Sequence, residues 1–499
     1  MTKARLGVLA ACLATTAIVL TLGWAWHTSR MPATYAVTDM GRPDYGGGPR
    51  DAGHHGSSAG HAGTSPGRSE VVSVRDLVEA RSTPADVTVD LVAAKQRFRL
   101  ASGRTVDGYT LNGSSPGPLI EARQGDLVEV RVRNESVPDG ITLHWHGVDV
   151  PNAEDGVAGV TQDAVGEGEE HTYRFVADDA GTYWYHSHQV SHRQVVRGLF
   201  GALVVHPTRH SLGEGDVLAV THQYGGVRTL NGREGDVPVV APPGRRVRVR
   251  VVNTDNAAVH VWSGGDFRVL AVDGTEVTGP TPVQQRYLTL AAGGRADLEV
   301  RVPRDGSAAR VQVERSTALL VGPRGSSAAP APRPPGELDL LGYGSRGDLG
   351  FDPARADRRF DYRIGRRPGF VAGRPGVWWS INGRLWPDVP MYVVEKGDVV
   401  VMRIENGSGE AHPMHLHGHH AVVLSRNGVA ASGAPWWVDS LHVRNGETFE
   451  VALVADNPGV WMDHCHNLQH ARDGLVAHLM YAGVSTPYRV GGEARNEPE

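Results

Sequence analysis

Histidine recurs at four places in the 499-residue chain as pairs that skip one residue. The pairs are His144/His146, His186/His188, His415/His417 and His464/His466. On a β-strand, residues i and i+2 point to the same face, so each pair presents two imidazoles side by side. Two adjacent imidazoles can reach two neighbouring metal ions, and imidazole suits borderline metals such as copper. The pairs therefore predict a metal cluster rather than scattered surface or core histidines.

A single cysteine lies inside the last of these pairs. Cys465 stands between the two histidines and therefore points to the opposite face of the strand. His470 follows it five residues later, and His412 precedes the third pair by three residues. One thiolate and two imidazoles form the ligand set of a blue-copper electron-transfer site. We expect an electron-entry site that the backbone of Cys465 joins to two ligands of the cluster.

An internal repeat organises the rest of the chain. A ten-residue pattern recurs at 125–134, 244–253 and 397–406, with Gly and Asn nine positions apart around a β-branched run. An Asn-Gly pair precedes each copy, and such runs punctuated by Gly and Pro are strand signals. The pattern predicts three related β-sandwich domains. Because the paired histidines fall only in the first and third of these domains, the middle domain is expected to be a spacer.

The N-terminal region predicts an extracytoplasmic protein. Residues 6–26 are uncharged and mostly apolar, follow Lys3 and Arg5, and would span roughly 31 Å as a helix. They are expected to be a signal anchor or a cleaved signal peptide. The chain contains only one other cysteine, Cys12, inside this segment, so no disulfide is expected. The formal charge of −5 shows no basic face for nucleic acid.

These features give the expected domain organisation. They do not determine the oligomeric state. The Gly-, Ser- and Pro-rich tether contains His54, His55 and His61, which are expected to be solvated. The predicted ranges are 1–29 for the signal or anchor, 30–83 for the flexible linker, 84–208 for domain 1, 209–321 for domain 2, 322–340 for a second linker and 341–490 for domain 3.

Residues 85–485 resemble the three-domain multicopper oxidases, the laccase-like family. The resemblance rests on four motifs, at 144–147, 184–188, 412–418 and 464–470. It implies an all-β fold of three cupredoxin-like Greek-key β-sandwich domains that hold four copper ions, with the trinuclear cluster between the first and third domains. The implied ligands are His412, Cys465 and His470 for type 1 copper, His144 and His415 for type 2 copper, and His146, His186, His188, His417, His464 and His466 for the type 3 pair.

The resemblance also implies the reaction. Four one-electron oxidations of phenols, aromatic amines or metal ions would be coupled to the reduction of O₂ to water. A metallo-oxidase for Cu(I) in copper tolerance is the alternative, although only eight methionines are present, without a cluster near the third-domain motifs. A non-catalytic cupredoxin-fold envelope protein is the rival of another class. It should have lost ligands, whereas all eleven are present.

Two positions near the motifs give further expectations. The axial position of the type 1 copper corresponds to Leu475, which cannot ligate, so we expect a higher potential than a methionine-ligated site would have. Asp155 resembles the acidic residue that donates protons near the type 2 copper. An aspartate that forms a turn before Gly156 is the alternative interpretation.

The region after Cys465 departs from the family pattern. Leu468 and Ala471 stand where some members have a proton-relaying glutamate, so Asp463 or Asp473 is left as a possible substitute. Asp439 is expected to orient a type 1 imidazole or to be an ordinary loop residue.

Overall fold

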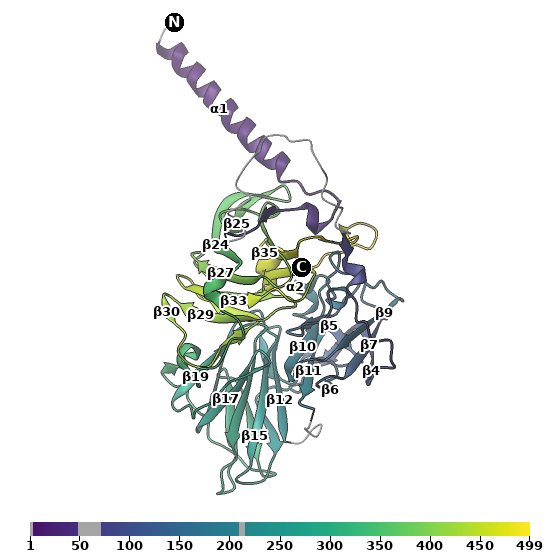
Figure 1. The fold of residues 1–499 in the computed structure, drawn as a ribbon, viewed down its shortest axis with the longest axis vertical. Coiled ribbons are helices and arrows are strands. Elements are labelled where there is room, and N and C mark those ends of the chain that lie inside the picture. Colours follow the sequence, from purple (N-terminus) through teal and green to yellow (C-terminus); the bar gives the residue numbers. More distant parts are fainter. Residues whose placement is uncertain (1–2, 48–70, 209–214) are drawn as a thin grey trace.

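The computed structural model describes residues 3–47, 71–208 and 215–499 of the chain (Figure 1). The helix α1 (Lys3–Thr28) extends away from a body made of β-sheets (Figure 1). Within the described residues, its segment Gly7–Thr28 is the one helix long and apolar enough to cross a membrane, judged by length and composition. None of that segment is buried in the protein, which suits a signal or an anchor.

The first β-sandwich contributes half of the site described below. Its two sheets have the strand orders β5-β4-β7-β9 and β6-β11-β10-β8. In β7, Val128, Val130 and Val132 are buried and alternate with Glu129 and Arg131, as a strand with one face on a core requires. The strands are β4 (Val87–Arg99), β5 (Thr105–Leu111), β6 (Ile120–Arg123), β7 (Leu127–Asn134), β8 (His144–His146), β9 (Glu170–Val176), β10 (Gly181–His186) and β11 (Phe200–His206).

The second β-sandwich has two six-stranded sheets, with the orders β13-β12-β15-β20-β17-β18 and β14-β22-β21-β16-β19-β23. Its strands are β12 (Asp216–Tyr224), β13 (Val227–Leu230), β14 (Asp236–Val240), β15 (Arg246–Asn253), β16 (Val259–Ser263), β17 (Phe267–Val272), β18 (Thr275–Glu276), β19 (Arg286–Leu290), β20 (Arg295–Arg301), β21 (Ala309–Val313), β22 (Thr317–Gly322) and β23 (Gly336–Glu337).

The third β-sandwich holds the orders β2-β26-β35-β34-β28-β32 and β25-β24-β27-β33-β29-β30, with β31 beside β29. Its strands are β2 (Arg42–Asp44), β24 (Arg358–Val371), β25 (Arg374–Ile381), β26 (Pro390–Val394), β27 (Val399–Asn406), β28 (His412–Leu416), β29 (Ala421–Arg426), β30 (Val429–Ala430), β31 (Trp437–Val438), β32 (Ser440–Val443), β33 (Thr448–Val454), β34 (Val460–Cys465) and β35 (Val476–Tyr481). The predicted all-β fold of three sandwiches is confirmed, while the exact domain boundaries stay predictions.

The sequence repeat is a repeat of strand pairing. The three copies form β7, β15 and β27, and each pairs in parallel with the strand that opens its sandwich, β4, β12 or β24. The asparagine that ends each copy, Asn134, Asn253 or Asn406, is buried and donates its side-chain amide to a loop carbonyl. Buried amides need such partners, which explains why the repeat ends on this residue type.

The segment expected to be a flexible linker is structured at both ends. β1 (Thr34–Tyr35) pairs with β37 (Val490–Gly491), β2 pairs with β26, and β3 (Val72–Ser73) pairs with β36 (Val484–Ser485). The short turns η1 (Val37–Asp39) and η3 (Val74–Asp76) bury Val37 and Val74. The expectation of a linker over 30–83 is therefore wrong for these ends, because β1 and β3 form two-stranded sheets with C-terminal strands and β2 extends the edge of a larger sheet. His54, His55 and His61 lie outside the described residues.

The remaining elements are short turns of helix. They are η4 (Asn152–Glu154), α2 (Ser191–Gln194), η5 (Leu340–Gly342), η6 (Pro353–Arg355) and α3 (Leu468–Arg472). Two of them border the site: η4 precedes Asp155, and α3 includes His470.

Candidate metal centre

The four histidine pairs meet between the first and third sandwiches. β8 pairs with β10 in the first sandwich and β28 pairs with β34 in the third, which brings His144 opposite His186 and His415 opposite His464. All eight side chains are almost completely buried. Their nitrogens converge in three groups, in each of which the ligand atoms lie within 4.8 Å of one another: His144/His146/His415, His146/His186/His466 and His188/His417/His464.

The donor atoms fit copper. Burial lowers the pKa of six of these imidazoles well below the usual value, so they are neutral and can ligate; they are His146, His186, His188, His415, His417 and His466. Several buried ring nitrogens, such as His186 Nε2 and both nitrogens of His188, have no hydrogen-bond partner among the described residues. Unpaired buried polar atoms are costly, and a bound metal ion would satisfy them.

The type 1 set converges on the other side of β34. Cys465 Sγ lies 3.5 Å from His412 Nδ1 and 3.8 Å from His470 Nδ1, and the two Nδ1 atoms are 3.2 Å apart. Burial raises the pKa of the Cys465 thiol, so a bound metal ion must displace its proton. Leu475 is buried in the same core cluster, and its carbonyl accepts from the Cys465 amide at 3.1 Å. The three donors suit copper, and the apolar Leu475 side chain in this core offers no further ligand atom.

The carboxylate of Asp155 contacts the histidine cluster. Its Oδ1 is 3.0 Å from His144 Nδ1, and its Oδ2 is 3.1 Å from His417 Nδ1. The turn that places it requires Gly156, at φ +72°, because a Cβ there would lie 1.8 Å from the carbonyl oxygen of Leu143. Asp155 therefore ends a turn and also contacts two imidazoles of the cluster, so its geometry agrees with both interpretations.

Asp439 also contacts the cluster, contrary to one expectation from the sequence. Its Oδ1 lies 3.2 Å from His146 Nε2, and its carbonyl oxygen lies 2.9 Å from His415 Nδ1. The expectation that Asp439 orients a type 1 imidazole is therefore wrong. Burial alone would raise the pKa of Asp439, but the positive charge of Arg295 lowers this pKa well below the usual value. Arg295 comes from β20, so the middle sandwich supplies a residue to the site and is more than a spacer.

Glu499 provides a carboxylate on the third-domain side of the cluster. Its Oε1 lies 3.0 Å from His464 Nδ1 and 3.9 Å from His188 Nε2, and its Oε2 accepts a hydrogen bond from Ser191 Oγ. By contrast, Asp463 alternates with His464 along β34 and faces the opposite way. No local spacing connects Glu499 to the histidine motifs, so reasoning from the sequence missed it.

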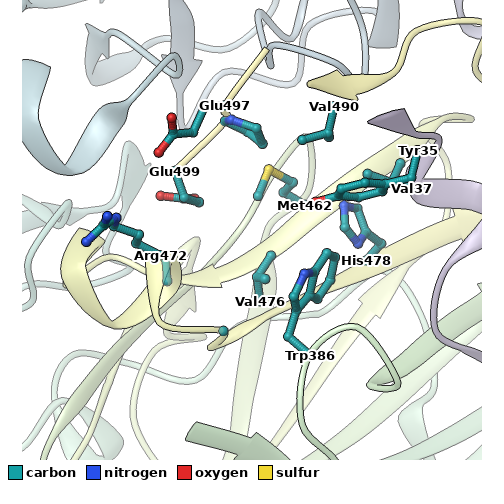
Figure 2. A pocket seen from close by; sticks show the side chains of 13 residues that line it. Tyr35, Val37, Trp386, Met462, Arg472, Val476, His478, Val490, Glu497 and Glu499 are labelled. Atoms are coloured by element: carbon teal, nitrogen blue, oxygen red, sulfur yellow. The ribbon is translucent and has the colours of Figure 1, made fainter. Parts of the chain in front are cut away.

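A cavity borders Glu499 (Figure 2). It has a volume of about 160 Å³ and lies among the N-terminal segment, the third sandwich and the C-terminal segment. Tyr35, Trp386, Met462 and His478 line it, with Glu499 at one side (Figure 2). The predicted tether thus forms part of a wall next to the cluster.

Comparisons with known proteins agree with this architecture. Models of the family described as multicopper oxidase match residues 93–210 and 355–483. Multicopper oxidase MmcO of Mycobacterium tuberculosis is 28% identical over 81% of this chain and 90% of its own length. Laccase-1 of Botryotinia fuckeliana is 27% identical over 75% and 79%, respectively. The crystal structure of a multi-copper oxidase from Pseudomonas thermotolerans is 29% identical, with a TM-score of 0.65 over 79% of this chain and 99% of that one.

Three cupredoxin-like sandwiches with histidine clusters between the outer two define a copper-dependent oxidoreductase. This chain belongs to the multicopper oxidases. It is a laccase-type enzyme that carries one type 1, one type 2 and a pair of type 3 copper ions, and it couples one-electron oxidations of a donor to the reduction of O₂ to water.

Proposed function

We propose a division of labour among the residues of the two sites. His412, Cys465 and His470 hold the type 1 copper, and His144 and His415 hold the type 2 copper. One type 3 ion is held by His146, His186 and His466, and the other by His188, His417 and His464. The observation that carries this assignment is the convergence of these donor atoms in the groups described above. When bound, copper supplies the one-electron redox chemistry.

The chain supplies the connection between the two sites. Peptide bonds join Cys465 to His464 and His466. The side chains of these two histidines lie on the cluster side of the strand. Alternation along a strand lets one short backbone segment hold both sites. An electron received at Cys465 therefore has a covalent path to two cluster ligands.

Asp155 is the proposed proton donor on the type 2 side. Its carboxylate is buried and contacts the outer nitrogens of His144 and His417, so it is fixed beside the ligands of both copper types. A carboxyl group within hydrogen-bond reach of the reacting region satisfies the geometric requirement for a general acid.

The proposed donors are phenols or aromatic amines rather than metal ions. Glu410 is the carboxylate nearest the outer edge of His470, at 3.5 Å from its Nε2, and this carboxylate is already paired with Arg366. A dedicated site for a metal-ion substrate needs carboxylates or soft ligands that are available to it. We also propose that the enzyme acts outside the cytoplasm, with α1 as an uncleaved anchor.

The test is a donor panel on the copper-loaded full chain. We expect four copper ions per chain, and O₂ uptake with a substituted phenol faster than with Cu(I) or Fe(II). Faster uptake with Cu(I) would identify a metallo-oxidase. A copper-loaded protein that is colourless and consumes no O₂ with any donor would overturn the assignment of the sites.

A further inference from the structure

Of the three proposed type 1 ligands, His470 is the one with an exposed edge. The His412 side chain is buried, and its Nε2 lies 2.8 Å from Ser408 Oγ. The His470 side chain keeps 13% of its surface exposed, and its Nε2 lies 3.2 Å from Asn467 Nδ2 and 3.5 Å from Glu410 Oε2. A small donor therefore approaches the edge of His470 and meets the groups that surround this imidazole.

Arg366 is held next to this edge by two contacts. Its guanidinium lies 4.0 Å from the centre of the Trp379 ring, on the neighbouring strand. Trp379 in turn packs against both type 1 imidazoles, with ring centres 4.7 Å from His412 and 4.5 Å from His470. The second contact is the ion pair of Arg366 with Glu410. An arginine fixed by an aromatic ring and a carboxylate keeps a permanent positive charge in one place.

Charges of both signs border the His470 edge. Glu410 directs one oxygen to Arg366 and the other to His470, and it keeps 47% of its side-chain surface exposed. Asp473, the other acid near α3, accepts a hydrogen bond from Gln469. Arg366 keeps 38% of its side-chain surface exposed, so a donor that approaches this edge meets its positive charge beside the negative charge of Glu410. Fixed charges at an encounter site change association rates in a salt-dependent way.

We propose that Arg366 admits anionic and neutral aromatic donors to the edge of His470 by offsetting the negative charge of Glu410, which alone would favour metal cations and cationic amines. The proposal rests on the proposed function, because it requires the type 1 site at His412, Cys465 and His470. Arg366 is a positioning and selecting residue that ligates nothing. Its charge also stabilises the reduced site, so it raises the type 1 potential.

The test is anaerobic stopped-flow bleaching of the blue absorption in the copper-loaded full chain. The anionic probes are hexacyanoferrate(II) and a sulfonated phenol, and the cationic probes are Fe(II) and a phenol with a quaternary ammonium group. In the wild type, the opposite charges of Arg366 and Glu410 should leave the rates of both kinds of donor only weakly dependent on salt. Arg366→Glu should slow the anionic donors on the order of tenfold at low salt, and added salt should then speed the anionic donors and slow the cationic ones. The same variant should lower the type 1 potential in a redox titration.

Matched variants make each outcome decisive. Arg374→Glu makes the same charge change at the exposed tip of the same hairpin and should behave like the wild type. Arg366→Lys should retain the weak salt dependence of the wild type, whereas Arg366→Gln should make added salt speed the anionic donors, and this pair decides the question if Arg366→Glu does not fold. Equal behaviour of the Glu variants at 366 and 374, or of the Lys and Gln variants, would overturn the proposal. If no donor bleaches the wild-type protein, the type 1 assignment fails instead.

Discussion

Arg295 and Asp439 form a bidentate ion pair that joins the second sandwich to the third. The guanidinium nitrogens lie 2.6 and 2.5 Å from the two carboxylate oxygens, and both side chains are almost completely buried. Because Asp439 also contacts His146 and His415, this pair connects the fold of the middle sandwich to the geometry of the cluster.

Arg295→Met should destabilise the protein and weaken copper binding. The substitution removes the bidentate partner of buried Asp439, although His420 Nε2 stays 3.3 Å from its Oδ2, and breaking a buried ion pair typically costs about 3–5 kcal/mol. We expect a lower thermal midpoint and fewer than four copper ions per chain, measured by calorimetry and metal analysis. Arg268→Met removes a partly exposed ion pair with Glu299 on the same sheet and serves as the control. Unchanged copper content in the Arg295 variant would show that the pair does not support the cluster.

Asp155→Asn should slow O₂ reduction without slowing electron entry. Loss of a positioned general acid typically costs about 10²–10⁴-fold in rate. Steady-state O₂ uptake should fall within that range, while anaerobic bleaching of the blue site and the copper content stay as in the wild type. Asp107→Asn, at an exposed aspartate of β5 in the same sandwich, is the control. If bleaching slowed as much as O₂ uptake, Asp155 would act on the structure of both sites rather than on proton delivery.

Leu475→Met should lower the potential of the type 1 site. The leucine is buried in one core cluster with Cys465 and offers no ligand atom, whereas a thioether can supply a weak axial bond. A redox titration followed by the blue absorption measures the shift. Leu479→Met places the same side chain in the same core but farther along the chain, and should leave the potential unchanged. Equal potentials of the wild type and the Leu475 variant would contradict the axial assignment.

Glu154→Gln should make stability less dependent on pH. Burial raises the pKa of Glu154 to about 7, above that of the unfolded chain, so the folded protein holds the extra proton between these values. Stability is therefore lost as the pH rises from about 4.5 to 7, by at most about 1.4 kcal/mol per unit. Relative to the wild type, the variant should have a higher thermal midpoint at pH 8 than at pH 5. Glu170→Gln, at an exposed site, is the control; the same difference in both variants would rule out Glu154 as the cause.

The histidine motifs allowed the sandwich repeat and the copper-ligand sets to be predicted because local alternation determines which side chains share a face. This is illustrated by His464, Cys465 and His466, because consecutive residues on a strand point alternately to its two sides. Contacts between segments that are far apart in the sequence leave no such local pattern in it. Arg295 contacts Asp439 across 144 positions, and Glu499 contacts His464 from the segment that follows β37. The ends of the predicted tether were missed for the same reason, because edge pairing depends on a neighbouring strand that the local composition does not show.

The most direct test of the account is O₂ uptake by Cys465→Ser with a phenolic donor. We expect the blue absorption to disappear while the cluster coppers remain. Donor-dependent O₂ uptake should fall to the background rate, because Cys465 is the path from the donor to the cluster. Cys12→Ser, in the exposed N-terminal helix, should behave as the wild type. If Cys465→Ser lost the blue absorption but still consumed O₂ at the wild-type rate, electrons would enter elsewhere and the central assignment would be wrong.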